Sequence, residues 1–296
     1  MYQYTVQDAK RIRVIVDTDA ACEADDPFAI VHALLSPKLL VKAIVAAHFA
    51  QPGSMERSLD VIRAIASLIP TEVPLLHGQP EPLRDDDSVS EGVAAIIAEA
   101  RSADSHPLWV LCLGAVTDVA RAIQLAPDIL PRLKVVAIGG QSYHLPYAGF
   151  REFNFGNDIQ AANTLLGSGA GVLQVPCDAY ATMRVGLAEL QRRVLPCGTL
   201  GKYLFEQMVR YNESEGAFWT AGESWSLGDN PAVGIALHPG CGLWKKQPAR
   251  KVNEDTTYAD EPLGTEITVY QSVDSRYVLE DLFAKIEIWH QKQEQP

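Results

Sequence analysis

Short apolar runs alternate with longer mixed segments over the first two-thirds of the chain. Continuous runs of Val, Ile, Leu and Ala predict strands over residues 13–16, 41–46, 108–113, 134–138 and 171–175. Segments with helical spacing predict helices over residues 27–36, 55–68 and 116–125. Strands buried on both faces of a parallel sheet have continuous apolar sequences, so this order predicts an α/β fold. We expect a mostly parallel central sheet flanked by helices, a sandwich of the Rossmann type.

Two long segments do not fit this alternation. Residues 139–157 and 211–230 are rich in aromatic side chains and lack a clear period. Loops of this length inside a compact domain are usually functional. A strand over residues 266–270 and a helix over 277–289 are predicted after them. No repeat or linker divides the sequence, so we expect one domain over residues 1–296.

Composition excludes several classes of protein. Of 296 residues, 47% are hydrophobic and 21% are charged, which is typical of a folded globular chain. The net charge of −12 disfavours nucleic-acid polymers and anionic membrane surfaces as partners. No apolar run is long enough for a membrane span, and the polar residues 1–10 do not resemble a signal peptide. Five scattered cysteines predict free thiols, and we expect a cytoplasmic protein.

The most informative segment is the acidic loop at residues 17–27, directly after the first predicted strand. It carries Asp17, Asp19, Glu23, Asp25 and Asp26 within ten residues. One carboxylate, that of Asp26 before a proline, could cap the following helix. The other carboxylates would repel one another unless a cation lay among them. Calcium and magnesium prefer oxygen ligands, so the loop predicts a site for a hard divalent cation.

The order strand, Asp-Thr-Asp, spacer, Asp-Asp, helix resembles the opening motif of the inosine-uridine-preferring nucleoside hydrolase family. The form in this chain is D-T-D-x5-D-D, two spacer residues longer than the commonest form. Further blocks follow in the family's order at residues 44–48, 113–118, 138–140, 152–158 and 228–233. The resemblance spans most of residues 12–240. It implies calcium-dependent hydrolysis of the N-glycosidic bond of a small ribonucleoside, which releases ribose and the free base.

The resemblance also implies roles for individual residues. The calcium ligands would be Asp19, Asp26, the main-chain carbonyl of Leu113, and Asp229. Asp19 would in addition be the general base that acts on a metal-bound water. The sugar hydroxyls would be held by Asp25, Glu152, Asn154 and Asp229, and Asp17 would support the loop. A homodimer or homotetramer with a role in nucleoside salvage is the corresponding expectation.

Two departures from the family pattern leave the leaving-group acid open. Gly228 stands where many members carry His, and His48 stands where they carry Asn. His48 follows a predicted strand and could protonate the departing base or bind the sugar. His144 is a further candidate acid. Stacking on the base is expected from Trp225, with Tyr143 and Trp219 as other candidates.

Two other functions remain open. A phosphatase of the haloacid dehalogenase type also begins with strand–Asp-x-Asp, but Ala20 and Ala21 follow here and the Asp25–Asp26 pair is then unexplained. A ribose- or nucleoside-binding protein with altered specificity or without turnover is the second alternative. Asp19 favours retained catalysis, whereas Gly228 favours its loss.

Overall fold

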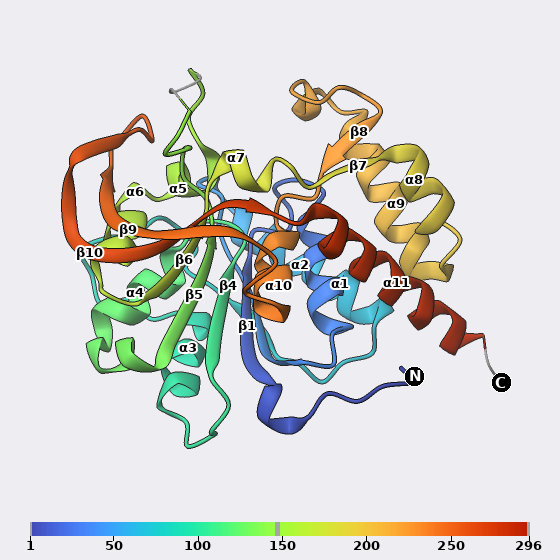
Figure 1. Cartoon of the computed structure of the whole chain (residues 1–296), viewed down its shortest axis with the longest axis horizontal. Helices are drawn as coiled ribbons and strands as arrows, with labels where there is room; N and C mark the ends of the chain where they lie inside the picture. Colours follow the sequence, from blue (N-terminus) through green and yellow to red (C-terminus); the bar gives the residue numbers. More distant parts are fainter. Residues whose placement is uncertain (1, 146–148, 295–296) are drawn as a thin grey trace.

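The computed structural model describes residues 2–145 and 149–294, and its centre is an eight-stranded sheet with the order β3-β2-β1-β4-β5-β6-β10-β9 (Figure 1). Its strands are β1 (Ile12–Thr18), β2 (Leu39–Ala46), β3 (Leu75–His77), β4 (Leu108–Cys112), β5 (Leu133–Ile138), β6 (Gly171–Val175), β9 (Gly242–Val252) and β10 (Tyr258–Val273). All neighbouring pairs are parallel except β9 with β10. The predicted fold class, a mostly parallel sheet flanked by helices, is confirmed.

Helices cover both faces of this sheet. They are α1 (Asp26–Leu34), α2 (Ser54–Leu68), α3 (Glu91–Arg101), α4 (Thr117–Leu125), α5 (Phe153–Asn157), α6 (Ile159–Gly167), α7 (Cys177–Tyr180), α8 (Leu187–Arg193), α9 (Gly198–Asn212), α10 (Asn230–Leu237) and α11 (Ser275–Gln293). Helices α1, α2, α9, α10 and α11 contribute to the core on one face, and α3, α4 and α6 to the core on the other. Successive residues of β1 point to opposite cores, with Val14 and Val16 in the first and Ile15 in the second. This two-sided burial explains why the strand sequences are continuously apolar.

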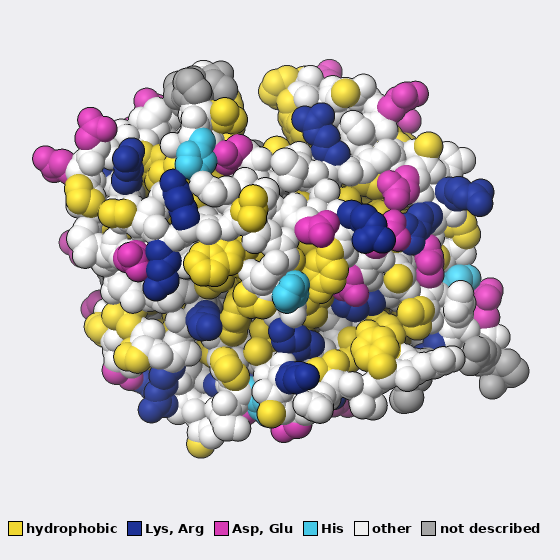
Figure 2. Space-filling model, viewed as in Figure 1, with side chains coloured by type: hydrophobic (Ala, Val, Ile, Leu, Met, Phe, Trp, Pro, Cys, Tyr) yellow, Lys and Arg dark blue, Asp and Glu magenta, His cyan; other side chains and the backbone are white. Residues whose placement is uncertain are grey.

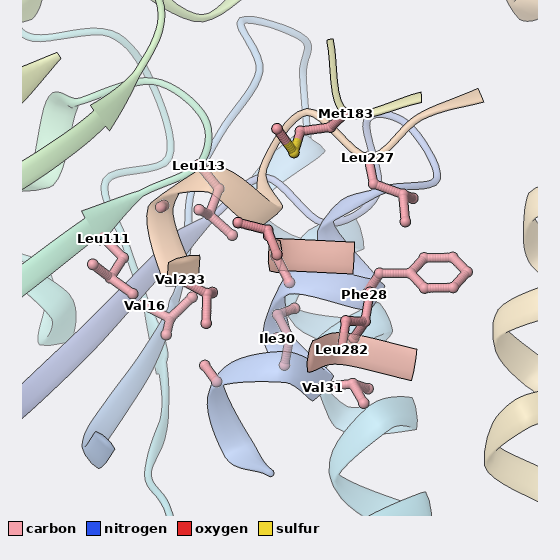
Figure 3. Close-up of a cluster of buried hydrophobic side chains, with 14 of the residues drawn as sticks. Val16, Phe28, Ile30, Val31, Leu111, Leu113, Met183, Leu227, Val233 and Leu282 are labelled. Atoms are coloured by element: carbon pink, nitrogen blue, oxygen red, sulfur yellow. The ribbon is translucent and has the colours of Figure 1, made fainter. Parts of the chain in front are cut away.

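The core on the α1 face lies directly beneath the carboxyl ends of β1 and β4. Val16 and Leu113 from the sheet side belong to the same core as Phe28 of α1 and Val233 of α10 (Figure 3). All four side chains are at most 1% exposed. The first turns of α1 and α10 are therefore fixed against the end of the sheet.

The two long segments contain structure that the sequence did not predict. The first includes helix α5, although residues 146–148 lie outside the described part of the chain. The second holds a 3-10 turn (Glu215–Ala217) and strand β8 (Ser224–Ser226), which pairs with β7 (Arg184–Gly186) in a separate two-stranded sheet. Strands β3 and β9 were also not predicted, and β10 is longer than the expected 266–270.

The surface of the molecule carries both signs of charge. On the face seen in Figure 2, Lys and Arg side chains are interspersed with Asp and Glu, without one broad basic area. Within the described ranges, no helix is both long and apolar enough to cross a membrane.

Candidate active site

Two helices begin with similar acidic sequences at the carboxyl end of the sheet. Helix α1 opens with Asp25-Asp26-Pro27, and α10 opens with Asp229-Asn230-Pro231; the first residue of each run is the N-cap. Asp25, Asp26 and Asp229 each offer a carboxylate oxygen, and these three oxygens lie within 4.8 Å of one another. The structure thus brings Asp229 to an adjacent pair of acids that lies more than 200 positions earlier in the sequence.

These carboxylates are not used to cap their helices. Asp25 and Asp229 occupy the N-cap positions of α1 and α10, but neither side chain makes a capping hydrogen bond. Asp26 instead accepts a hydrogen bond from the Thr18 hydroxyl at the end of β1, and its carboxylate lies beside that of Asp229. Helix capping therefore does not explain why these acids lie here.

Asp19 lies beside this cluster, against the backbone that follows β4. A Cβ atom added to Gly114 would come within 2.4 Å of the Asp19 carboxyl carbon, so only glycine fits at this position. The Asp19 side chain is 3% exposed, and its Oδ2 atom has no hydrogen-bond partner among the described residues. Leu113, whose carbonyl is an expected metal ligand, directly precedes Gly114.

The charge of the cluster is uncompensated. Burial raises the pKa of Asp19, Asp25 and Asp229 well above the usual range, and neighbouring carboxylates raise it further. In the described part of the chain, the charged groups that act on these acids are other carboxylates. A hard divalent cation would relieve the repulsion among these carboxylates, so the residues fit such an ion.

Asp17, expected to support the loop, lies fully buried near the carboxyl end of β1. Its pKa is raised by burial and then by Asp118, a second buried acid. Asp118 accepts hydrogen bonds from the Gln79 amide and the Ser90 hydroxyl. Asp17 therefore stands between the acidic cluster and a hydrogen-bonded carboxylate behind it.

Glu152 is also fully buried, and several donors surround its carboxylate. Its Oε1 accepts from the Asn154 amide at 3.2 Å and from the Tyr180 hydroxyl at 3.2 Å, and its Oε2 accepts from the Phe155 amide at 3.0 Å. The Gly140 amide donates to it as well. Glu152 is thus the N-cap of α5 in this structure.

Asn154, predicted to hold a sugar hydroxyl, connects two strand ends. Its Nδ2 donates to the Leu113 carbonyl at 2.6 Å and to the Ile138 carbonyl at 3.0 Å. Both amide hydrogens are therefore used, and the carboxamide oxygen is the atom left to contact a ligand. The Leu113 carbonyl keeps one lone pair for a metal ion.

Gly228, which replaces the family's His, lies against two of these groups. Its N–H donates to Asp25, and a Cβ added to it would lie 3.3 Å from Asp25 Oδ2 and 3.3 Å from Tyr180 Cδ2. A side chain at this position would be tightly crowded. The half-buried ring of Tyr180 fills the adjoining space.

His48 is buried and both of its ring nitrogens are engaged. Nδ1 accepts from the Ala50 amide at 3.1 Å, so Nε2 carries the hydrogen and donates to the Thr117 hydroxyl at 2.8 Å. Thr117 in turn donates to Asp158. Burial lowers the pKa of His48 to about 4. This arrangement favours a structural role over proton donation to a base.

The expected aromatic residues fall into two groups, with Trp219 and Trp225 in one and Tyr143 in the other. Trp225 is 1% exposed and packs edge-on against Tyr211 and Trp219, with ring centroids 5.4 and 4.9 Å apart. Trp219 is 46% exposed and is the outer member of this group. His144 is exposed and bonded to Gln271, and Tyr143 stacks on Tyr258.

Comparison with known proteins decides the family. Residues 14–280 match the inosine-uridine preferring nucleoside hydrolase family. The chain belongs to this family. The pyrimidine-specific ribonucleoside hydrolase RihA of Salmonella agona is 24% identical over 264 residues, with 79% of each chain covered. The predicted enzyme class, a hydrolase of N-glycosyl compounds, is confirmed, and the phosphatase alternative is disfavoured.

Solved structures of nucleoside hydrolases share the fold. The purine-preferring ribonucleoside hydrolase from Gardnerella vaginalis superposes with a TM-score of 0.71 at 20% identity, covering 95% of this chain and 99% of the other. The type III effector protein XopQ, solved with adenosine diphosphate ribose, gives a TM-score of 0.70 at 14% identity, covering 95% and 94%. The fold thus occurs in proteins with differing ligands.

Sequence reasoning missed Tyr180 at this nucleoside-hydrolase site. Tyr180 ends the short helix that follows β6, at the same edge of the sheet as the acidic loop. The general rule that functional loops follow strand carboxyl ends could have directed attention to residues 176–182. Glu23 of the acidic loop is half-buried, and its partial desolvation together with the neighbouring Asp26 raises its pKa to about 7.

Proposed function

We propose that this chain is a calcium-dependent ribonucleoside hydrolase. The observation that carries the proposal is the buried cluster of Asp25, Asp26 and Asp229, with Asp19 beside it and an unpartnered Oδ2. Asp19, Asp26, Asp229 and the Leu113 carbonyl would hold the ion. When bound, calcium would supply positive charge that neutralises these carboxylates and orients water and diol oxygens.

Asp19 is the general base of the proposed reaction. Its carboxylate accepts a proton from the water that attacks the anomeric carbon of the sugar, and the bond from that carbon to the base nitrogen breaks. Its Oδ2, which has no hydrogen-bond partner among the described residues, is the atom available to accept this proton. The main chain of Gly114 holds the carboxylate in place.

Asp25 and Asp229 bind the sugar in this proposal. Carboxylates accept hydrogen bonds from ribose hydroxyls and place negative potential beside the positive charge that develops on the sugar. The same negative potential repels phosphate groups. Neutral ribonucleosides are therefore favoured over nucleotides.

In this proposal the nucleobase leaves without a proton from residue 228, because Gly228 has no acidic side chain. We expect His48, neutral near pH 7 and engaged on both sides, to position Thr117 instead of donating a proton. Trp225 is buried and packs against Trp219, so the exposed ring of Trp219 is the one of the two that can stack on a base. The named relatives act on pyrimidine or purine ribosides, so both classes of base belong in the test.

The test is a panel of purine and pyrimidine nucleosides, with their 5′-monophosphates, assayed for free ribose or ribose phosphate. We expect ribose release from at least one nucleoside and none from its monophosphate. Asp19→Asn should lower kcat by about two to four orders of magnitude, as loss of a general base does. Asp60→Asn, an exposed change on α2, is the matched control.

A non-catalytic ribose-binding protein is the second candidate, because Gly228 removes the family's acid. It predicts ribose binding without release from any member of the panel. Equal turnover by wild type and Asp19→Asn would instead place the base elsewhere, with Glu23 next in line.

A further inference from the structure

Tyr180 lies between two groups of the site that carry negative charge. Its hydroxyl donates to Glu152 Oε1 at 3.2 Å, and its ring edge lies next to Gly228, on the side of Asp25. The tyrosine follows β6, so it reaches the site from a strand that supplies none of the predicted ligands. This inference rests on the proposed function.

The surroundings of Glu152 determine whether Glu152 or Tyr180 can contact a ligand. Glu152 is 0% exposed, and its carboxylate already accepts three backbone N–H bonds besides the Tyr180 hydroxyl. Two of those bonds, from the Asn154 and Phe155 amides, form the cap of α5 and cannot be released without disturbing that helix. A sugar hydroxyl would reach the carboxylate only by displacing one of its donors.

Tyr180 is the accessible member of the pair. Its side chain is half-buried, whereas Glu152 is not exposed at all. The Tyr180 hydroxyl donates its hydrogen to Glu152. The phenol oxygen therefore keeps lone pairs that can accept a hydrogen bond from a ligand. The Glu152 carboxylate polarises the Tyr180 hydroxyl, and this polarisation strengthens any hydrogen bond that the phenol oxygen accepts.

We propose that Tyr180 is a sugar-binding residue, whose phenol oxygen accepts a hydrogen bond from a hydroxyl of the riboside, while Glu152 acts behind it as a positioning residue. Gly228 belongs to the same arrangement. A Cβ there would lie 3.3 Å from both Tyr180 and Asp25, so a larger residue at position 228 would press on the tyrosine ring and shift it.

The experiment measures kcat and KM for p-nitrophenyl riboside, whose departure needs no acid and so isolates sugar recognition. Tyr180→Phe keeps the ring and loses only the hydroxyl. We expect KM to rise about three- to tenfold, the effect of one neutral hydrogen bond, with kcat within about twofold of wild type. Tyr270→Phe is the control, because it also loses one buried hydroxyl bond, to the Pro239 carbonyl on another part of the sheet.

A double-mutant cycle separates the roles of the two residues. If Glu152 acts through Tyr180, Glu152→Gln should raise KM in the wild-type background and add little in the Tyr180→Phe background. Additive losses would show that Glu152 meets the sugar directly and would overturn its assignment as a positioning residue. A KM for Tyr180→Phe that matches Tyr270→Phe would overturn the assignment of Tyr180, whatever Glu152→Gln does.

Failure of the proposed function is recognised separately. Calorimetric titration with ribose measures sugar binding even in a protein that does not turn over. Loss of ribose affinity in Tyr180→Phe without any wild-type turnover would support the inference and refute catalysis. A wild-type protein that neither hydrolyses ribosides nor binds ribose would overturn both.

Discussion

Gly114→Ala should separate the position of the catalytic base from its chemistry. The added Cβ would lie 2.4 Å from the Asp19 carboxyl carbon and from its Oδ1, and 2.9 Å from its Cβ. Ordinary contacts begin near 3.4 Å, so the overlap is 3.4 − 2.4 = 1.0 Å. All three close atoms belong to the Asp19 side chain. Because Asp19 directly follows strand β1, we expect its carboxylate to move and its backbone to stay in place.

A displacement of about 1 Å at a reacting group can lower the rate by roughly 100-fold. We therefore expect Gly114→Ala to lower kcat on a nucleoside by about two orders of magnitude. Overpacking should also cost about 1–3 kcal/mol of unfolding free energy. Steady-state kinetics and denaturant unfolding measure the two effects on the same protein.

The control is Gly167→Ala at the end of α6, where the nearest atom to the new Cβ is 3.9 Å away. This variant should keep the wild-type kcat. A folded Gly114→Ala protein with wild-type kcat would refute the reasoning, because Asp19 could then not be the base held by this backbone.

Three further outcomes follow from the site. Asp26→Ala should abolish calcium binding in a calorimetric titration and remove the rise in Tm that calcium gives the wild type; an unchanged calcium affinity would exclude Asp26 as a ligand. In chelated protein the pKa of Asp25 and Asp229 is raised above the unfolded value, so the stability they contribute is lost as pH rises. The Tm of that protein should therefore increase from pH 8 to pH 6.5, a trend that saturating calcium should remove. His48→Ala should lower the rates on a nucleoside and on p-nitrophenyl riboside by the same factor, because His48 is buried and neutral; a selective loss on the nucleoside would restore it as the acid.

The sequence predicted the parts of the fold that local patterns encode. The apolar runs predicted most of the parallel strands, and the resemblance to the family implied the function of the acidic loop. Strands β3 and β9 were missed for different reasons. β3 is only three residues long, and β9 is an edge strand whose Lys and Arg residues hide any apolar pattern.

The candidate site was predicted as a set of residues but not as an arrangement. Nothing near Glu152 in sequence reveals that Tyr180, 28 positions later, donates to its carboxylate. The burial of His48 depends in the same way on Thr117, 69 positions away. Such contacts are set by packing between distant segments, which a single sequence does not express.

The most direct test of calcium-dependent hydrolysis is ribose release before and after removal of the metal. Wild-type protein is treated with chelator, its metal content is measured by elemental analysis, and calcium is then returned. We predict loss of ribose release with the metal and recovery on addition of calcium, because only a cation relieves the repulsion among Asp19, Asp25, Asp26 and Asp229. Full ribose release from protein shown to be free of metal would contradict the account.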